Sequence, residues 1–247
     1  MKKMICFATG SIWRWAENRG ELLSFIKKLH VQGVELTTGN ISQFYKFRMS
    51  AKDISWLREM DRVSIHAPFR MKRDARSPKE VENILEMLEK MYQKTKATLV
   101  IIHPLDLPPL EVLSNYSMAI STENLPKNRK ITIRKLKNIM AKYPEMGFCL
   151  DVGHAYSWDR FMVGKLVDAF RDRITQVHLH GCYRKKDHLS LRNVSKTYIK
   201  SLEPIRSLNV PLVIEEDMIF RNLAKLCEEV EYVHRVFGEN KNFIYLH

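Results

Sequence analysis

The chain has 247 residues, of which 45% are hydrophobic, enough for a sizeable core. No apolar run approaches the roughly 20 residues that a membrane helix requires, so we expect a protein without a membrane partner. Lysine and arginine outnumber aspartate and glutamate by 41 to 28. The resulting net charge of +13 favours polyanionic or phosphorylated partners, although a generally basic proteome would explain it equally well.

The cysteines argue for a reducing compartment. There are four, without C-x-x-C spacing, and two of them, Cys6 and Cys149, fall inside predicted strands as small apolar side chains. Residues 1–10 contain two lysines and an apolar run shorter than that of a secretory signal, so we interpret them as the first strand. We therefore expect a cytoplasmic protein, and we expect it to be a monomer.

Strand-like apolar runs alternate with amphipathic helical stretches along the chain. The predicted strands are 4–8, 33–36, 63–66, 99–103, 119–123, 148–151, 174–178 and 212–215. The predicted helices are 21–30, 51–60, 77–94, 131–142, 161–170, 195–208 and 219–237, with only a turn or two of helix in the proline-rich stretch 104–117. Eight strands with intervening helices predict an α/β fold, a single (β/α)8 TIM barrel spanning 1–247 as one domain. An open doubly wound sheet is the alternative, but no glycine-rich phosphate loop follows the first strand.

Six of the predicted strands end on a histidine or an acidic residue. These residues are His66, His103, Glu123, Asp151, His178 and Glu215. The carboxyl ends of barrel strands converge on one mouth, so the six side chains are expected to meet there. A lone histidine at a strand end is more often structural than a ligand, but imidazole and carboxylate groups on six strands predict a metal site.

Four other histidines and one glutamate are interpreted one by one. His180 alternates to the same side as His178, one layer further out, and is ambiguous. Glu216 alternates away from the barrel interior, so we interpret it as a surface carboxylate or one that supports the site from behind. We interpret three histidines as structural or solvated: His30, His234 and His247.

The motif Asp151-Val-Gly-His154-Ala, followed by the strand that ends at His178, resembles the xylose isomerase-like TIM-barrel superfamily over nearly the whole chain. That superfamily includes endonuclease IV and many sugar isomerases and epimerases. The resemblance implies one metal ion held by Glu123, Asp151, His178 and Glu215. For an endonuclease IV it further implies a second ion at His66 and His103, with Glu123 bridging, and a third at His154 and an Asp-x-His pair whose histidine matches His188.

The sequence departs from the family pattern at that pair. Lys186 stands at the carboxylate position, although Asp187 is adjacent and could reach in. The Gly-Glu-Gly that commonly follows is replaced by residues 191–193. The third metal is therefore in doubt.

Two enzymatic functions fit these residues. The first is an endonuclease IV-like phosphodiesterase acting on abasic or damaged DNA, with two or three divalent ions, zinc by preference and manganese as the alternative. Its catalytic residues would be Glu123, Glu215 and His154. Basic and aromatic side chains in loops on the same face would bind phosphates and bases; they are Trp13, Arg14, Tyr45, Arg70 and Lys186.

The second function is isomerisation or epimerisation of a sugar or sugar phosphate at one ion. Glu123 and Glu215 would then exchange protons on opposite faces of the reacting carbon. This reaction has no need of His103. A barrel that binds metal without turnover is a third possibility, because of Lys186.

Overall fold

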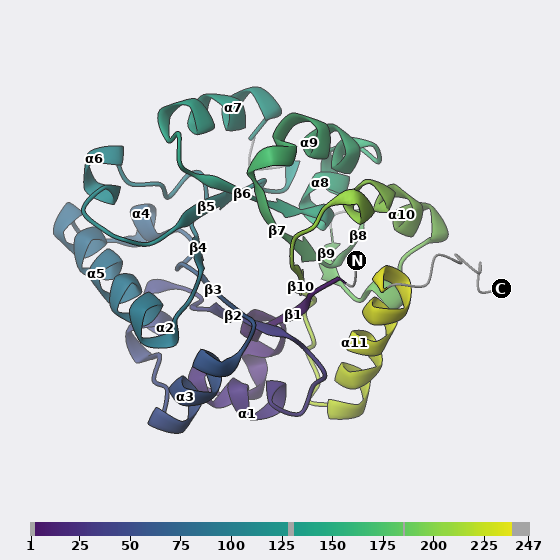
Figure 1. Ribbon diagram of the computed structural model, residues 1–247, viewed down its shortest axis with the longest axis horizontal. Coiled ribbons are helices and arrows are strands. Elements are labelled where there is room, and N and C mark those ends of the chain that lie inside the picture. The colour runs from purple at the N-terminus through teal and green to yellow at the C-terminus, as the bar shows by residue number, and fades with distance from the viewer. Residues whose placement is uncertain (1–2, 128–130, 185, 239–247) are drawn as a thin grey trace.

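A computed structural model describes residues 3–127, 131–184 and 186–238. Eight parallel strands close into a barrel in the order β1-β10-β7-β6-β5-β4-β3-β2 (Figure 1). They are β1 (Ile5–Ala8), β2 (Gly33–Thr37), β3 (Arg62–His66), β4 (Leu99–Ile101), β5 (Ile120–Glu123), β6 (Gly147–Asp151), β7 (Ile174–Leu179) and β10 (Leu212–Ile214). The predicted (β/α)8 barrel is confirmed.

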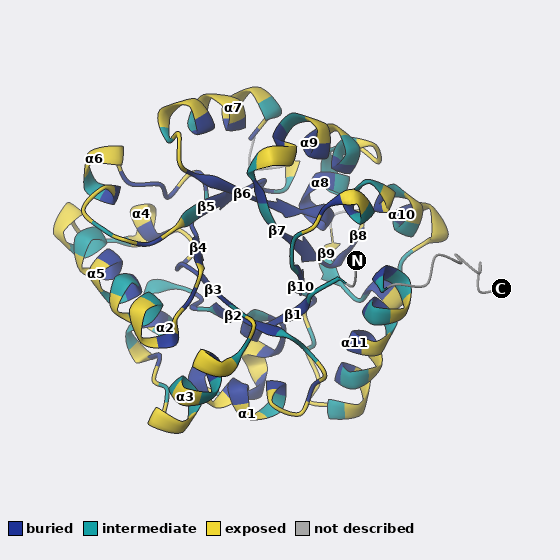
Figure 2. Ribbon diagram, viewed as in Figure 1, coloured by how far each residue is buried: buried dark blue, intermediate teal, exposed yellow. Residues whose placement is uncertain are grey.

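Helices surround the barrel and bury the faces that they turn toward it (Figure 2). They are α1 (Leu23–Ile26), α2 (Ile41–Lys46), α3 (Ala51–Glu59), α4 (Met71–Asp74), α5 (Pro78–Thr95), α6 (Leu110–Leu113), α7 (Ile133–Lys142), α8 (Val152–Trp158), α9 (Met162–Phe170), α10 (Lys196–Ser201) and α11 (Leu223–Phe237). The longest, α5, lies within one residue of the predicted range 77–94 at each end. The Ser77 side chain caps it by accepting a hydrogen bond from the Glu80 amide, and Pro78 occupies the first turn. None of the described helices is long and apolar enough to cross a membrane.

Two predicted helices are much shorter than expected. The stretch 21–30 forms only a 3-10 turn (Arg19–Leu22) and the single turn α1. The stretch 195–208 is divided into α10 and a 3-10 segment (Glu203–Ser207), because Pro204 has no amide hydrogen to continue the helix. The last helix begins at Leu223 rather than 219, where the Asn222 side chain caps it.

A hairpin and a helix that follow β7 and β6 at the barrel mouth were not predicted, and neither were the short helices α2 and α4. A hairpin of β8 (Gly181–Tyr183) and β9 (Lys186–Leu189) follows β7. The helix α8 begins immediately after β6, and the Asp151 side chain caps it by accepting a hydrogen bond from the His154 amide at 2.6 Å. His154 is thus held on a rigid helix one turn from the end of a strand, not in a loop.

Gly33 provides a test of how closely the barrel wall is packed. It lies in β2 between two other strands, and a Cβ added there would stand 2.5 Å from the Cys6 sulfur and 2.7 Å from the Arg62 carbonyl oxygen. Because one of these contacts is with backbone, a side-chain rotation cannot relieve it.

We therefore expect Gly33→Ala to lower the free energy of unfolding by about 1–3 kcal/mol, as overpacking usually does. The measurement is chemical denaturation followed by circular dichroism. The matched control is Gly164→Ala in α9, where the nearest atom to the new Cβ is Pro204 Cγ at 3.5 Å. Alanine there should be neutral or stabilising, by up to about 1 kcal/mol. Equal stability of the two variants would contradict this account of β2.

Candidate metal centre

The six predicted residues at the strand ends do converge at the carboxyl mouth of the barrel. Four of them are the last or next-to-last residues of β3, β5, β6 and β7. His103 lies two residues beyond β4, and Glu215 lies directly after β10. Their side chains form overlapping groups whose ligand atoms lie within 4.8 Å of one another, among them His66–His103–Glu123.

Glu123 is the centre of this arrangement. One carboxylate oxygen, Oε1, lies 2.9 Å from His103 Nε2. The other, Oε2, lies 3.2 Å from His178 Nδ1 and 3.9 Å from His66 Nε2. Burial disfavours the charged form of Glu123, but the nearby His103 charge and hydrogen bonds hold its pKa well below the usual range. The ionised carboxylate therefore faces two different groups of ligands at once.

His178 is completely buried between carboxylates. Its Nδ1 lies 2.9 Å from Glu215 Oε2 and 4.0 Å from Asp151 Oδ2, in addition to the contact with Glu123. Its other nitrogen, Nε2, lies 3.2 Å from Glu35 Oε2. Placing the hydrogen on Nε2, where it donates to Glu35, leaves the Nδ1 lone pair directed at the three acidic residues of the mouth.

Two of these atoms lack a hydrogen bond, although they are buried. Among the described residues, neither Glu123 Oε2 nor His178 Nδ1 has a partner with hydrogen-bond geometry. Two buried acceptor atoms 3.2 Å apart are costly unless a cation lies between them. Without metal that cation is a proton: burial opposes it, but Cys149 and the Glu215 charge raise the pKa of His178 well above its usual value. The donor set and its unsatisfied atoms therefore fit a divalent metal ion.

Glu35 supports the site from below and was not predicted. It lies in the middle of β2, is completely buried, and accepts hydrogen bonds from Ser64 Oγ at 3.0 Å and Gln176 Nε2 at 2.7 Å. Together with the His178 contact, these bonds form a polar layer inside the barrel, beneath the metal ligands. The signal in the sequence was an acidic residue in the middle of an otherwise apolar strand.

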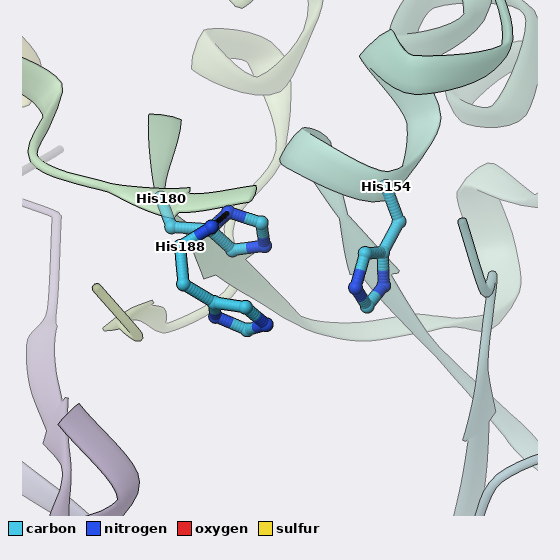
Figure 3. Close-up of side chains that lie close together, drawn as sticks. All are labelled: His154, His180 and His188. Atoms are coloured by element: carbon cyan, nitrogen blue, oxygen red, sulfur yellow. Dashed lines mark hydrogen bonds between the residues drawn. The ribbon is translucent and has the colours of Figure 1, made fainter. Parts of the chain in front are cut away.

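A third group of ligands comprises His154, His180 and His188 (Figure 3). The rings of His180 and His188 stack with centroids 4.1 Å apart, and His154 faces them from α8. His154 Nδ1 lies 3.0 Å from the Asn124 carbonyl oxygen and His188 Nδ1 lies 2.7 Å from that of Glu215. If both Nδ1 atoms donate, both Nε2 atoms remain free to bind an ion.

The carboxylate nearest this third group comes from Asp187. Its Oδ2 lies 3.9 Å from His154 Nε2, and both Asp187 and His188 line the cavity described below. Lys186, in contrast, is exposed on β9. The residue that reaches toward His154 is thus the neighbour of the position at which the family pattern places an aspartate.

His180, which the sequence left ambiguous, orients Asp151. Its Nε2 lies 3.0 Å from both carboxylate oxygens of Asp151, and burial and the Asp151 charge together set its pKa at about 9, above the ordinary value. The Tyr198 hydroxyl donates to the His180 carbonyl at 2.5 Å. A Cβ at Gly153 would overlap the His180 ring, so the glycine of the Asp-Val-Gly-His motif makes room for this histidine.

Glu216 is not a surface residue: it is only 2% exposed. Burial and the neighbouring Glu229 carboxylate raise the pKa of Glu216 to about 10, so it is protonated at neutral pH. Glu229 in turn accepts hydrogen bonds from Ser190 Oγ and the Leu191 amide. The interpretation of Glu216 as a surface residue is therefore wrong; its side chain lines the cavity, and its role in supporting the site from behind stays a prediction.

The ligand groups open into a cavity of about 600 Å³. Of the predicted substrate-binding residues, Trp13 and Arg70 line it. Three others do not: Arg14 pairs with Asp217, Tyr45 contacts Glu80 through its hydroxyl, and Lys186 is exposed. The cavity is also lined by Arg19, which the sequence did not suggest.

Of the other predicted structural histidines, His234 lies on α11, and its Nε2 contacts the His30 carbonyl oxygen at 2.9 Å. His247 lies outside the described residues. All four cysteines are free thiols, and Cys6 and Cys149 are buried in strands as predicted.

No protein-family model and no curated protein matches this chain. Solved structures do match it along nearly their whole length. A D-tagatose 3-epimerase-like protein is 20% identical with a TM-score of 0.67, covering 95% of this chain and 99% of that one. Endonuclease IV from Thermus thermophilus is 15% identical with a TM-score of 0.65, covering 95% and 97%. A xylose isomerase domain-containing protein from Salmonella typhimurium is 16% identical with a TM-score of 0.62, covering 96% and 98%. The chain therefore has the fold of the xylose isomerase-like TIM barrels.

Proposed function

We propose that this protein is a metal-dependent phosphodiesterase of the endonuclease IV kind, which cleaves DNA at abasic or otherwise damaged sites. The observation that carries the proposal is the position of Glu123. Its two oxygens face different ligand groups, His103 on one side and His178 on the other. A bridging carboxylate of this kind is what two adjacent ions share in a phosphodiester-cleaving site.

His66, His103 and Glu123 would hold one ion, and Glu123, Asp151, His178 and Glu215 would hold the other. The mixture of imidazole and carboxylate ligands suits zinc first and manganese second. His154 and His188, with Asp187, would hold a third ion. Divalent ions at these positions supply Lewis-acid chemistry, which withdraws charge from the phosphate oxygens and the attacking water.

The residues of the chain supply the orientation. Burial opposes ionisation of Glu215, but the His178 charge lowers its pKa, so this carboxylate is ionised at the cavity wall, where it would bind metal and orient the attacking water by accepting a hydrogen bond from it. Burial lowers the pKa of His154. When a neutral His154 donates its Nδ1 hydrogen to the Asn124 carbonyl oxygen, its Nε2 presents a lone pair, and no charge, to the cavity.

The cavity wall offers groups suited to a nucleic acid. Trp13 and Phe69 are each 38% exposed and both line the cavity, together with Arg70. Aromatic rings stack on bases, while arginine binds backbone phosphates. The chain's net charge of +13 would favour the approach of a polyanion to the protein.

The alternative is a sugar or sugar-phosphate isomerase or epimerase. Its supporting observation is that Glu123 and Glu215 both approach His178 Nδ1, at 3.2 and 2.9 Å, so that one ion would lie between two potential proton-transfer groups. An epimerase-like protein is also among the structural neighbours. This reaction does not require His66 or His103.

His103→Ala separates the two functions. We expect the zinc content to fall by one ion per chain, and the cleavage of an oligonucleotide containing an abasic site to fall at least about 100-fold, because one side of the bridged site is lost. The measurements are elemental analysis and a gel-based cleavage assay. The control is His234→Ala, which removes a histidine of α11 outside the cavity and should change neither.

An unchanged metal content in His103→Ala would contradict the two-ion site. A wild-type protein that holds one ion and interconverts ketoses or their phosphates, without cleaving abasic DNA, would replace the proposal by the isomerase alternative.

Glu35→Gln tests the support beneath the ligands. Removing the charge that accepts the His178 Nε2 hydrogen should weaken binding of the ion at His178 by about 10- to 100-fold, as such second-layer changes usually do. Competition with a chromogenic chelator measures this affinity. The matched control is Ser64→Ala, which removes a hydrogen bond to the same Glu35 oxygen but leaves its charge. If Glu35→Gln binds metal as tightly as Ser64→Ala, Glu35 has no part in metal binding.

A further inference from the structure

Two of the eight barrel strands end without a metal ligand. β1 ends at Ala8 and β2 at Thr37, and these two strands are neighbours in the barrel. The mouth therefore has a sector in which the metal-binding groups are absent. The side chain of Arg19 lies over this sector, because its Nη1 donates to the Thr37 carbonyl oxygen at the end of β2.

Arg19 is buried to an unusual degree. It is 6% exposed, and no other arginine among the described residues falls in the buried class. It begins the 3-10 turn Arg19–Leu22, which the Asn18 side chain caps by accepting a hydrogen bond from the Gly20 amide. The backbone that carries the guanidinium is thus fixed by its own local structure.

The guanidinium has few partners, and none of them is charged. Nη1 reaches Thr37 at 3.3 Å and Nη2 reaches Gln43 Oε1 at 3.2 Å, both long for hydrogen bonds. Nε has no partner among the described residues, and no described carboxylate lies within 4.0 Å of the group. Only two of the five N–H groups of this side chain are therefore bonded.

Such a group is costly to bury. A cation out of contact with water is normally paired with an anion, because its lost hydration is otherwise uncompensated. Burial lowers the pKa of Arg19 to about 10, which still leaves the side chain protonated at neutral pH. A permanent charge held in this position, without an internal counter-ion, indicates an external one.

The same cavity that reaches the metal ligands also reaches Arg19. Gly39, at a φ of 80°, lies so close that a Cβ there would stand 2.8 Å from Arg19 Nη2. Arg70 lines the cavity as well, with a left-handed φ of 61° and its amide donating to Asp106 Oδ2 at 2.9 Å. The cavity thus has three arginines in its wall, Arg19, Arg70 and Arg73, in addition to its metal-binding groups, and only Arg73 of the three is paired with a carboxylate, that of Asp74, among the described residues.

We infer that Arg19 is the anchor of an anion subsite, which binds a phosphate group of the substrate other than the group that reacts at the metal ligands. A guanidinium forms paired hydrogen bonds with phosphate oxygens, and a phosphate has enough oxygens to accept from a second cation such as Arg70. A cavity of about 600 Å³ has room for a ligand that spans both regions. The inference rests on the proposed function in placing the substrate in this cavity; the phosphate is either one that flanks a DNA lesion or that of a sugar phosphate.

The first test uses inorganic phosphate and protein freed of metal by a chelator, so that bound ions cannot hold the anion. Isothermal titration at neutral pH should show saturable binding with a dissociation constant of about 1 mM or below. Arg19→Met should weaken it by about tenfold or more, equivalent to one charge-assisted hydrogen bond, and Arg19→Lys by less. The control is Arg58→Met, which removes the same charge from the exposed face of α3 and should bind as the wild type does.

Absence of saturable phosphate binding in the folded wild-type protein would overturn the inference, whatever the variants do. Binding that persists unchanged in Arg19→Met would also overturn it, since the protonated histidines of the metal-free mouth would then be the anion site.

The second test uses the metal-loaded protein and distinguishes the two sources of phosphate. If the phosphate flanks a DNA lesion, Arg19→Met should raise the KM for an abasic-site oligonucleotide about tenfold with a smaller change in kcat. If it belongs to a sugar phosphate, the same KM effect should appear for a ketose phosphate and not for the unphosphorylated ketose. Phosphate binding that depends on Arg19, without DNA cleavage, would uphold the subsite and reject the phosphodiesterase. DNA cleavage together with phosphate binding that does not depend on Arg19 would support the phosphodiesterase and reject the subsite.

Discussion

The structure depends on the burial of the Glu123 carboxylate at the point where the barrel strands converge. This group has almost no access to water, so its charge must be balanced by the protein. Without metal, protons provide the balance: burial opposes protonation of His66, but Glu123 raises the pKa of that histidine to about 9. A metal ion at this site would therefore compete with protons for the same lone pairs, and its binding would release protons. The barrel keeps its acidic ligands ionised with or without metal.

The backbone decides which nitrogen of each histidine faces the mouth. In His66, His154 and His188, Nδ1 lies within 3.0 Å of a main-chain carbonyl oxygen, which directs Nε2 toward the cavity. His178 is turned the other way, and there the carboxylate of Glu35 takes the place of the carbonyl. Glu35 thus fixes the orientation of the His178 ring, as main-chain carbonyl groups fix the rings of the other three histidines. This is why His178 can face three carboxylates with Nδ1 while remaining completely buried.

The sequence predicts the parts of this site that follow from periodicity. Strands that end on His66 or Asp151 can be recognised because parallel strands bring their carboxyl ends together. Glu35 and Arg19 were missed because their roles depend on residues that are distant in the sequence. The nearest partner of Glu35, Ser64, lies 29 residues away, and the nearest partner of the Arg19 guanidinium, Thr37, lies 18 residues away. The helix α8 was missed because Asp151 serves both as a strand end and as a helix cap, which leaves no connecting loop for a pattern to reveal. Charge partners and dual roles are properties of the closed barrel.

The groups on the two sides of Glu123, together with Arg19, limit the chemistry that the cavity can support. One ion between Glu123 and Glu215 would be enough to polarise a sugar carbonyl, and an isomerase would gain nothing from His66 at the end of β3 and His103 just beyond β4. When a phosphodiester is cleaved, the leaving oxygen gains negative charge in addition to the charge already on the phosphate, so the proposed reaction would benefit from cation-binding groups on both sides of Glu123. Arg19 adds a cation beyond those ligands, in the sector where β1 and β2 end without a metal-binding group. A substrate that satisfies all three regions must carry negative charge at more than one point along its length, and a nucleic acid backbone has this property throughout.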